Sequence, residues 1–120
     1  MMLRNILFVA FGGAVGSVFR YLVSFLFIAK KIPASTFAVN IIGSFLIGII
    51  MAYITKQANS QTSQLLIVTG FCGGFTTFSA FSWDIVLMLQ QARYFSAATY
   101  ILATIIFGVA FAFLGFWISK

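Results

Sequence analysis

Apolar residues dominate four long stretches of the chain, and short polar segments separate them. The apolar stretches are Asn5–Ala29, Pro33–Thr55, Leu65–Leu89 and Tyr94–Ile118, and the segments between them are "KKI", "KQANSQTSQ" and "QQAR". A helix needs about 20 mostly apolar residues to cross the hydrocarbon core of a bilayer. The pattern therefore predicts an all-α membrane protein in which residues 1–120 form a single domain of four transmembrane helices.

Composition supports insertion into a membrane and narrows the function classes. The chain is 62% hydrophobic and contains seven basic residues, one acidic residue and no histidine. A Ser-His-Asp triad and a histidine-ligated zinc site both lack their residues, so we predict that the protein is not an enzyme. The net charge is +6, and apart from Arg20 the basic residues stand singly or in pairs near the ends of the spans. That distribution is typical of membrane flanks and not of a nucleic-acid-binding patch.

The basic residues that flank the four spans are divided equally between the two sides of the membrane. One side has Arg4, Lys56 and Lys120, and the other has Lys30, Lys31 and Arg93. An excess of Lys and Arg on one side normally sets the orientation of a membrane protein. Equal numbers leave two interpretations open. Either other features orient the chain, or it inserts both ways and two opposed copies form an antiparallel, dual-topology homodimer.

Polar side chains within the spans recur at four-residue spacing, which places them on one face of a helix. Arg20 follows Gly12 and Gly16 in the first span at this spacing. A charge inside a membrane is a functional candidate. The Arg20 side chain either extends to the interface or faces a wet vestibule that attracts anions.

The second and fourth spans have similar polar faces. Asn40 and Ser44 are four residues apart, and so are Tyr100 and Thr104. Asn40 either joins helices by hydrogen bonds or directs its amide hydrogens into a pore. The hydroxyls of Tyr100 and Thr104 likewise either serve the packing of the helix or line a pathway.

The third span contains the stretch "GFCGGFTTFSAFSWD", residues 70–84, which is unusual for a helix. Gly70, Gly73 and Gly74 each weaken a helix by about 1 kcal/mol relative to alanine. We therefore predict a break in the third helix. Broken membrane helices bind ions through the backbone groups that lose their helical partners. Freed carbonyls suit a cation, whereas freed N–H groups suit an anion.

Phenylalanines accompany this predicted break. Phe75, Phe78 and Phe81 are spaced by three residues, and an aromatic ring is electropositive at its edge, so such rings suit an anion. A chain with sixteen phenylalanines also contains such spacings for reasons of composition alone. Hydroxyl donors stand beside the rings at Thr77, Ser79 and Ser82.

Three stretches, "GGAVGSVFRY", "FAVNIIGSFLIG" and "GFCGGFTTFSAFSWD", resemble in order and spacing the signature stretches of the Fluc/CrcB family of fluoride channels. The resemblance covers essentially the whole chain. It implies a multi-pass protein of the inner (plasma) membrane that passively and selectively exports fluoride from the cytoplasm. It also implies a dual-topology homodimer with two antiparallel pores.

The resemblance further implies roles for individual residues. Phe78, Phe81 and Asn40 correspond to pore-lining positions, and Arg20 corresponds to the vestibule arginine. Tyr100 and Thr104 belong to a polar track on the fourth helix, which is either shorter here or completed by Thr77, Ser79 or Ser82.

A structural sodium ion is also implied, at the centre of the dimer. The backbone carbonyls of Gly73 and Thr76 correspond to its ligands. Asp84 stands where the family often has glutamate.

Two other functions remain as alternatives. A small multidrug-resistance transporter also has four short helices and often dual topology, but it needs a carboxylate in the membrane, typically a glutamate in the first helix. This chain contains no glutamate. A non-conducting subunit of a membrane assembly would explain the glycines and Asn40, but not a broken, hydroxyl-rich helix together with an intramembrane arginine.

Overall fold

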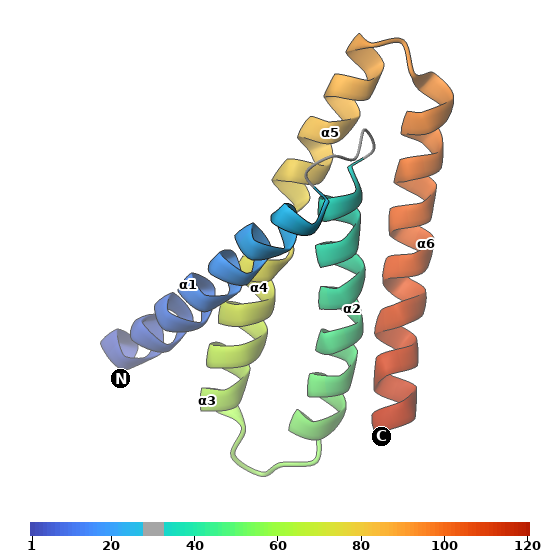
Figure 1. The fold of residues 1–120 in the computed structure, drawn as a ribbon. Coiled ribbons are helices and arrows are strands. Elements are labelled where there is room, and N and C mark those ends of the chain that lie inside the picture. The colour runs from blue at the N-terminus through green and yellow to red at the C-terminus, as the bar shows by residue number, and fades with distance from the viewer. Residues whose placement is uncertain (28–32) are drawn as a thin grey trace.

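A computed structural model describes residues 1–27 and 33–120, and the regular elements of this part of the chain are helices. α1 (Met2–Leu26), α2 (Ala34–Ile54) and α6 (Tyr94–Ser119) are continuous α-helices. The region between α2 and α6 consists of consecutive shorter helical segments (Figure 1). These are α3 (Gln61–Ser63), a π-helix (Gln64–Cys72), α4 (Gly73–Phe75) and α5 (Phe78–Gln90).

Four stretches are long and apolar enough to cross a membrane, which confirms the coarse prediction from hydropathy. They are Met2–Leu26, Ala34–Ile54, Gln61–Gln90 and Tyr94–Ser119. The first begins three residues before the predicted span and the third begins four residues before it. The end of the first predicted span, together with Lys30 and Lys31, lies outside the described residues.

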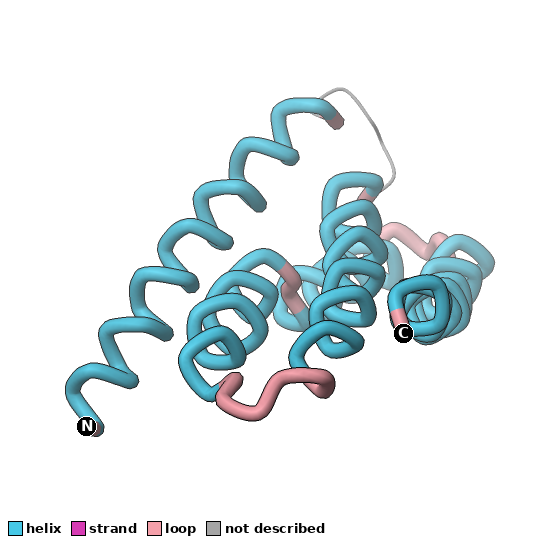
Figure 2. The backbone as a smooth tube through the Cα atoms, turned by 90° about the horizontal axis from the view of Figure 1, so that it is seen from below, coloured by secondary structure: helices cyan, strands magenta, loops and turns pink. Residues whose placement is uncertain are grey.

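The helices form a splayed bundle in which α2 and α6 run side by side in the same direction (Figure 1). Both chain termini and the connection between α2 and α3 lie at one end, and the turn between α5 and α6 lies at the other. Lys56 Nζ donates a hydrogen bond of 2.9 Å to the carbonyl oxygen of Ser119, which links the ends of α2 and α6. Seen from below, α1 lies on the outside of the bundle (Figure 2).

Close backbone packing joins α1 to the third span. Gly12 and Gly16 are buried, and a Cβ at either position would overlap backbone atoms of the π-helix. The third span contributes a glycine of its own to this contact, because a Cβ at Gly74 of α4 would press against the backbone of Gly13 in α1. Small residues let membrane helices approach this closely, so the glycines bring two backbones into direct contact.

The glycines of the third span are themselves helical, contrary to what their low helix propensity suggests. Gly70 belongs to the π-helix, and Gly73 and Gly74 belong to α4. The extended residues come directly after them, because Thr76 has φ −85° and ψ 158° and Thr77 has φ −152° and ψ 119°. Gly70 and Gly74 are needed for the approach of α1, and that packing offsets the cost of glycine in a helix.

Large apolar side chains cover much of the outer surface. Only 11% of the most apolar window of α1 and 6% of that of α6 are buried within one copy of the chain. Such surfaces are stable against lipid or against another apolar protein surface. One copy of the chain therefore presents most of its apolar helical surface to its environment.

Candidate functional site

The side chain of Asn40 holds the two extended residues between α4 and α5. Asn40 Oδ1 accepts a hydrogen bond of 2.8 Å from the backbone N–H of Thr77, and Asn40 Nδ2 donates one of 3.1 Å to the Thr77 carbonyl. These two hydrogen bonds fix which end of the amide is oxygen and which is nitrogen, because the backbone N–H can only donate and the carbonyl can only accept. An amide nitrogen carries two hydrogens, so one hydrogen of Asn40 Nδ2 is not used in this pairing.

Thr77 also caps the helix that follows. Its Oγ1 accepts a hydrogen bond of 3.2 Å from the backbone N–H of Ala80 and lies 3.2 Å from Ser79 Oγ. A threonine in this position satisfies one of the N–H groups that a helix start leaves without a partner. A local side chain therefore caps the start of α5, whereas the backbone of Thr77 itself is bonded to Asn40 of α2.

These two arrangements change the partners of two carbonyl groups. In a continuous α-helix the N–H of Thr77 would serve the carbonyl of Gly73, and the N–H of Ala80 would serve the carbonyl of Thr76. Here the two N–H groups donate to Asn40 Oδ1 and Thr77 Oγ1 instead. The carbonyls of Gly73 and Thr76 thus lose the donors that an uninterrupted helix would supply.

A groove of about 580 Å³ passes along these residues. Its walls come from α2, the π-helix, α4, α5 and α6, and its lining is mainly apolar with a small set of polar side chains. These polar residues are Asn40, Ser44, Thr69, Thr76, Thr77 and Thr104. Thr104 Oγ1 is buried and has no hydrogen-bond partner among the described residues. A buried hydroxyl without a partner is costly, which makes this atom a candidate ligand group.

Two phenylalanines border the groove and differ in exposure. Phe78 is 78% exposed and Phe81 is 7% exposed. Their ring centroids are 5.8 Å apart at an interplanar angle of 49°. The Phe81 ring also packs on Tyr100, with centroids 5.0 Å apart. Tyr100 therefore packs against the buried Phe81 ring, while Phe78 projects from the surface of the single chain.

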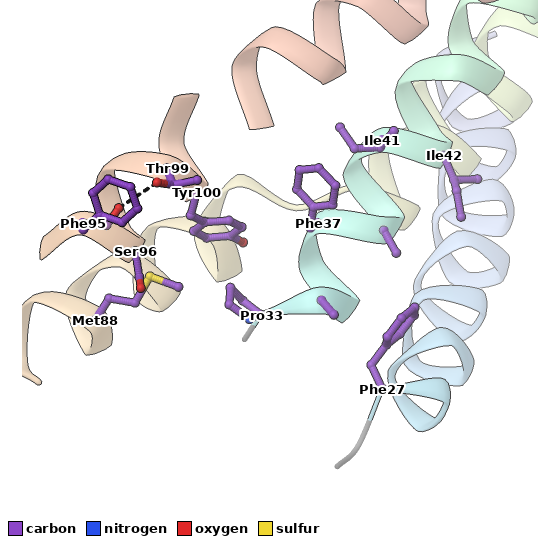
Figure 3. Close-up of a pocket in the computed structure, with 12 residues that line it drawn as sticks. Phe27, Pro33, Phe37, Ile41, Ile42, Met88, Phe95, Ser96, Thr99 and Tyr100 are labelled. Carbon is purple, nitrogen blue, oxygen red and sulfur yellow. Dashed lines mark hydrogen bonds between the residues drawn. The ribbon is translucent and has the colours of Figure 1, made fainter. Parts of the chain in front are cut away.

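Tyr100 faces a second, almost wholly apolar pocket of about 570 Å³ rather than the groove (Figure 3). Phe37, Met88 and Phe95 also line that pocket, and the hydroxyl of Thr99 is bonded to the Phe95 carbonyl at 2.9 Å. Tyr100 Oη donates a hydrogen bond of 2.9 Å to Asp84 Oδ2. In this single chain Tyr100 therefore lines the apolar pocket and Thr104 lines the groove; the resemblance implies one polar track for both.

The other predicted site residues differ in whether they line the groove. Ser79 is bonded to Thr77, and Ser82 Oγ donates to the Phe78 carbonyl at 3.0 Å; neither side chain belongs to the groove lining. Arg20 lies partly buried on α1, and α1 contributes no described residue to the groove. Gly73 and Thr76 do line it.

Around the groove, backbone carbonyl oxygens are the atoms that could coordinate a cation. The described residues contain no cluster of three or more His, Cys, Asp or Glu side chains. Unwound backbone carbonyls are known ligands of Na⁺ in membrane proteins. The carbonyls of Gly73 and Thr76 fit such a role, because the hydrogen bonds of an uninterrupted helix do not occupy them.

Ser44 is a groove residue that the predicted site did not include. It lies one helical turn beyond Asn40 on α2, and Ser44 Oγ donates to the Asn40 carbonyl at 2.7 Å. The signal for it was the four-residue spacing from Asn40, which the sequence contains.

These features define a class of protein. The chain is a multi-pass α-helical membrane protein whose third span is bordered, midway along its length, by a groove with polar side chains and phenyl rings. Intramembrane polar groups of this kind mark ion or substrate pathways.

Comparison with known proteins identifies the family. The family model described as "CrcB-like protein, Camphor Resistance (CrcB)" matches residues 7–116, and the chain belongs to this family. The resemblance seen in the three signature stretches is thereby confirmed.

Relatives match over nearly their full length. The chain is 40% identical to a protein of Leptospira interrogans, covering 98% of this chain and 95% of the relative. It is 43% identical to a protein of Agrobacterium fabrum, covering 97% and 96%, and 40% identical to one of Escherichia fergusonii, covering 98% and 94%. Each of these relatives is named "Fluoride-specific ion channel FluC".

Proposed function

We propose that this protein is a fluoride-selective channel that passively exports fluoride from the cytoplasm across the inner membrane. The chain belongs to the CrcB family, and similar proteins along its whole length are named as fluoride-specific ion channels. The observation in this chain that carries the proposal is the groove. Hydrogen-bond donors of Asn40 and Thr104 line it together with the rings of Phe78 and Phe81.

The physical problem that such a channel solves is dehydration. Moving a bare, unpaired ion from water into an apolar interior costs tens of kcal/mol. A pathway must therefore replace the lost water with fixed donors. The second hydrogen of Asn40 Nδ2 and the unpartnered hydroxyl of Thr104 supply such donors; the Thr104 hydroxyl is buried and the Asn40 side chain is partly buried.

Aromatic rings supply a second kind of contact. The edge of a phenyl ring is electropositive, so it attracts an anion without offering water a hydrogen bond. The Phe81 ring is buried and packs on the rings of both Phe78 and Tyr100. Donors and ring edges that must contact a dehydrated ion directly fit fluoride better than the larger chloride when they are close together. Each contact is weak, and conduction requires several weak sites in series rather than one deep site.

Arg20 has a separate role in this proposal. A guanidinium group in the membrane attracts anions and raises their concentration near the mouth of a pathway. Its position on α1, away from the groove lining, agrees with a vestibule and not with a site of dehydration.

We also propose that two copies assemble as an antiparallel dual-topology homodimer with sodium at its centre. Thr76 and Thr77 have extended backbone within the third span, and Gly73 is exposed at the surface of the single chain. Equal numbers of basic flanking residues and large exposed apolar faces support two opposed copies. When bound, sodium would offset the repulsion among carbonyl oxygens of Gly73 and Thr76 brought together from both copies.

The sodium proposal is tested by ion exchange. Replacing Na⁺ with N-methyl-D-glucamine at constant ionic strength should lower the thermal stability of the purified dimer, as followed by size-exclusion chromatography after heating. Equal dimer stability in both salts contradicts a structural sodium ion.

The channel proposal is tested by release of fluoride from loaded proteoliposomes, followed with a fluoride electrode. We expect rapid release of fluoride and no release of chloride above the rate of protein-free vesicles. Fluoride release at the protein-free rate, from protein that elutes as a single folded species, contradicts the proposal. Equal release of the two halides contradicts selectivity alone.

A further inference from the structure

One level of the groove lacks a hydroxyl on α6. Gly108 follows Thr104 by four residues, so it lies on the same face one turn further along, and both residues line the groove. Glycine offers no side-chain donor. A pathway lined by hydroxyls on α6 alone would therefore lose its donors beyond Thr104.

Ser44 on α2 occupies the space beside Gly108. A Cβ built on Gly108 would lie 3.6 Å from Ser44 Oγ, the nearest atom of a neighbouring element. Ser44 also lines the groove. At the level where α6 has no hydroxyl, the nearest side-chain oxygen therefore comes from the facing helix.

The hydroxyl of Ser44 has a partner that it can exchange. Its hydrogen is donated to the carbonyl of Asn40, four residues earlier in α2, at 2.7 Å. A serine hydroxyl rotates about its Cβ–Oγ bond, and this bond back to its own helix satisfies the donor when no ligand is present. Hydrogen bonds to an ionised acceptor are about twice as strong as neutral ones, so an arriving anion competes successfully with the carbonyl.

Ser44 also continues an existing row of donors. Asn40 lies one turn before it on the same face of α2, with one amide hydrogen left over from its pairing with Thr77. Thr104, with its unpartnered hydroxyl, lies across the groove on α6. Three polar hydrogens on two helices thus border one groove.

We propose that Ser44 is a direct anion ligand of the groove and supplies the hydroxyl that Gly108 lacks on α6. The inference rests on the proposed function, and it adds a residue of α2 to the pathway. In the competing, purely structural role, the Ser44 hydroxyl only satisfies the carbonyl of Asn40 and never contacts an ion.

The first test is Ser44→Ala, measured by fluoride release from proteoliposomes. The variant should fold, because alanine favours a helix and a serine that bonds back to its own helix slightly destabilises it. Size-exclusion elution identical to that of the unmodified protein verifies this. We expect fluoride release to fall by about tenfold, as for the loss of one hydrogen bond to a charged group.

The second test moves the hydroxyl across the groove. In the double variant S44A/G108S, the added Cβ has room, since its nearest neighbours in the unmodified protein are Ser44 Oγ at 3.6 Å, which S44A removes, and Ile41 Cδ1 at 4.0 Å. We expect fluoride release to recover to within threefold of the unmodified protein. The matched control, S44A/G108A, adds the same carbon atom without the hydroxyl and should remain as slow as S44A.

Each outcome has a distinct meaning. Release by S44A at the unmodified rate overturns the role of Ser44 and leaves the channel proposal intact. Equal fluoride release by S44A/G108S and S44A/G108A also overturns the ligand role of Ser44. That result would mean that a hydroxyl at position 108 cannot replace the one lost from Ser44. If the unmodified protein itself releases fluoride no faster than empty vesicles, the proposed function fails and this inference fails with it.

Discussion

The third span meets two different neighbours, and it is held to them by different physical means. Against α1, the contact brings backbone onto backbone, and an added carbon atom at Gly12, Gly16 or Gly74 has no room. Against α2, the amide of Asn40 bonds to the backbone of Thr77 beside an open groove. The first contact depends on shape and tolerates no increase in size. The second depends on polar chemistry and tolerates little change of donor or charge.

This difference separates the parts of the molecule that carry stability from those that we propose carry transport. The α1 contact lies on the side of the third span that is away from the groove lining. Substitutions there should act on folding and on flux together. Substitutions in the groove should change flux far more than folding.

The largest effect is expected at Gly16. A Cβ at this position would overlap the backbone of the π-helix at Phe71, and backbone cannot move aside as a side chain does. Gly16→Ala should therefore separate α1 from the third span and destabilise the protein by about 3 kcal/mol. Thermal unfolding in detergent measures the loss, and flux should disappear with the folded protein.

Gly13→Ala is the matched control in the same helix. A Cβ at Gly13 would lie 3.8 Å from the Gly70 carbonyl oxygen, which is an ordinary contact. Its stability should change by less than about 1 kcal/mol, within the range set by helix propensity. Equal destabilisation by G16A and G13A would show that close packing is not what holds α1.

Asn40→Asp comes next and should stop fluoride release altogether. The carboxylate cannot donate to the Thr77 carbonyl, and its charge repels an anion in the groove. Release should fall to the rate of protein-free vesicles, while the lost hydrogen bond costs about 2 kcal/mol of stability. Asn59→Asp makes the same chemical change in the exposed connection between α2 and α3, and its release rate should stay within twofold. Normal conduction by N40D would remove Asn40 from the pathway.

Phe81→Ile tests the aromatic contribution. Isoleucine keeps the site apolar but removes the ring that packs on Phe78 and on Tyr100. Fluoride release should fall by about 100-fold, equivalent to about 2.7 kcal/mol, and the protein should still elute as a folded species. Phe45→Ile is the control, because Phe45 pairs with Phe111 outside the groove lining. Similar losses in both variants would mean that apolar packing, and not the ring edge, is required.

The smallest effect is expected at Thr104, and its two consequences have opposite signs. Thr104→Val removes a buried hydroxyl that has no partner among the described residues, so stability should rise by about 1 kcal/mol. The same change removes a proposed ligand, so fluoride release should fall by about tenfold. Thr99→Val is the control, because its hydroxyl is bonded to the Phe95 carbonyl and lies outside the groove. Unchanged release by T104V would exclude its hydroxyl from the pathway.

Much of the fold was predictable, because the signals are local. Spans of about 20 apolar residues follow from hydropathy, and the three signature stretches led to the family. The position of the extended residues was less accessible. The prediction placed the break within residues 70–84, and the extended backbone lies in this stretch at Thr76 and Thr77, whereas the three glycines that motivated the prediction are helical. Helix propensity describes an isolated helix. It does not include the packing of α1 against these glycines, which keeps them helical here.

The sequence by itself determined that the chain crosses a membrane four times and places polar residues at helical spacing inside it, since both properties depend only on the order of residues. The tertiary structure decided which of those polar groups meet. It paired Asn40 with Thr77, turned the hydroxyl of Tyr100 to Asp84, and set Ser44 beside Gly108. The reason is geometric: spacing along a helix defines a face, but only the packing of other helices determines what that face contacts.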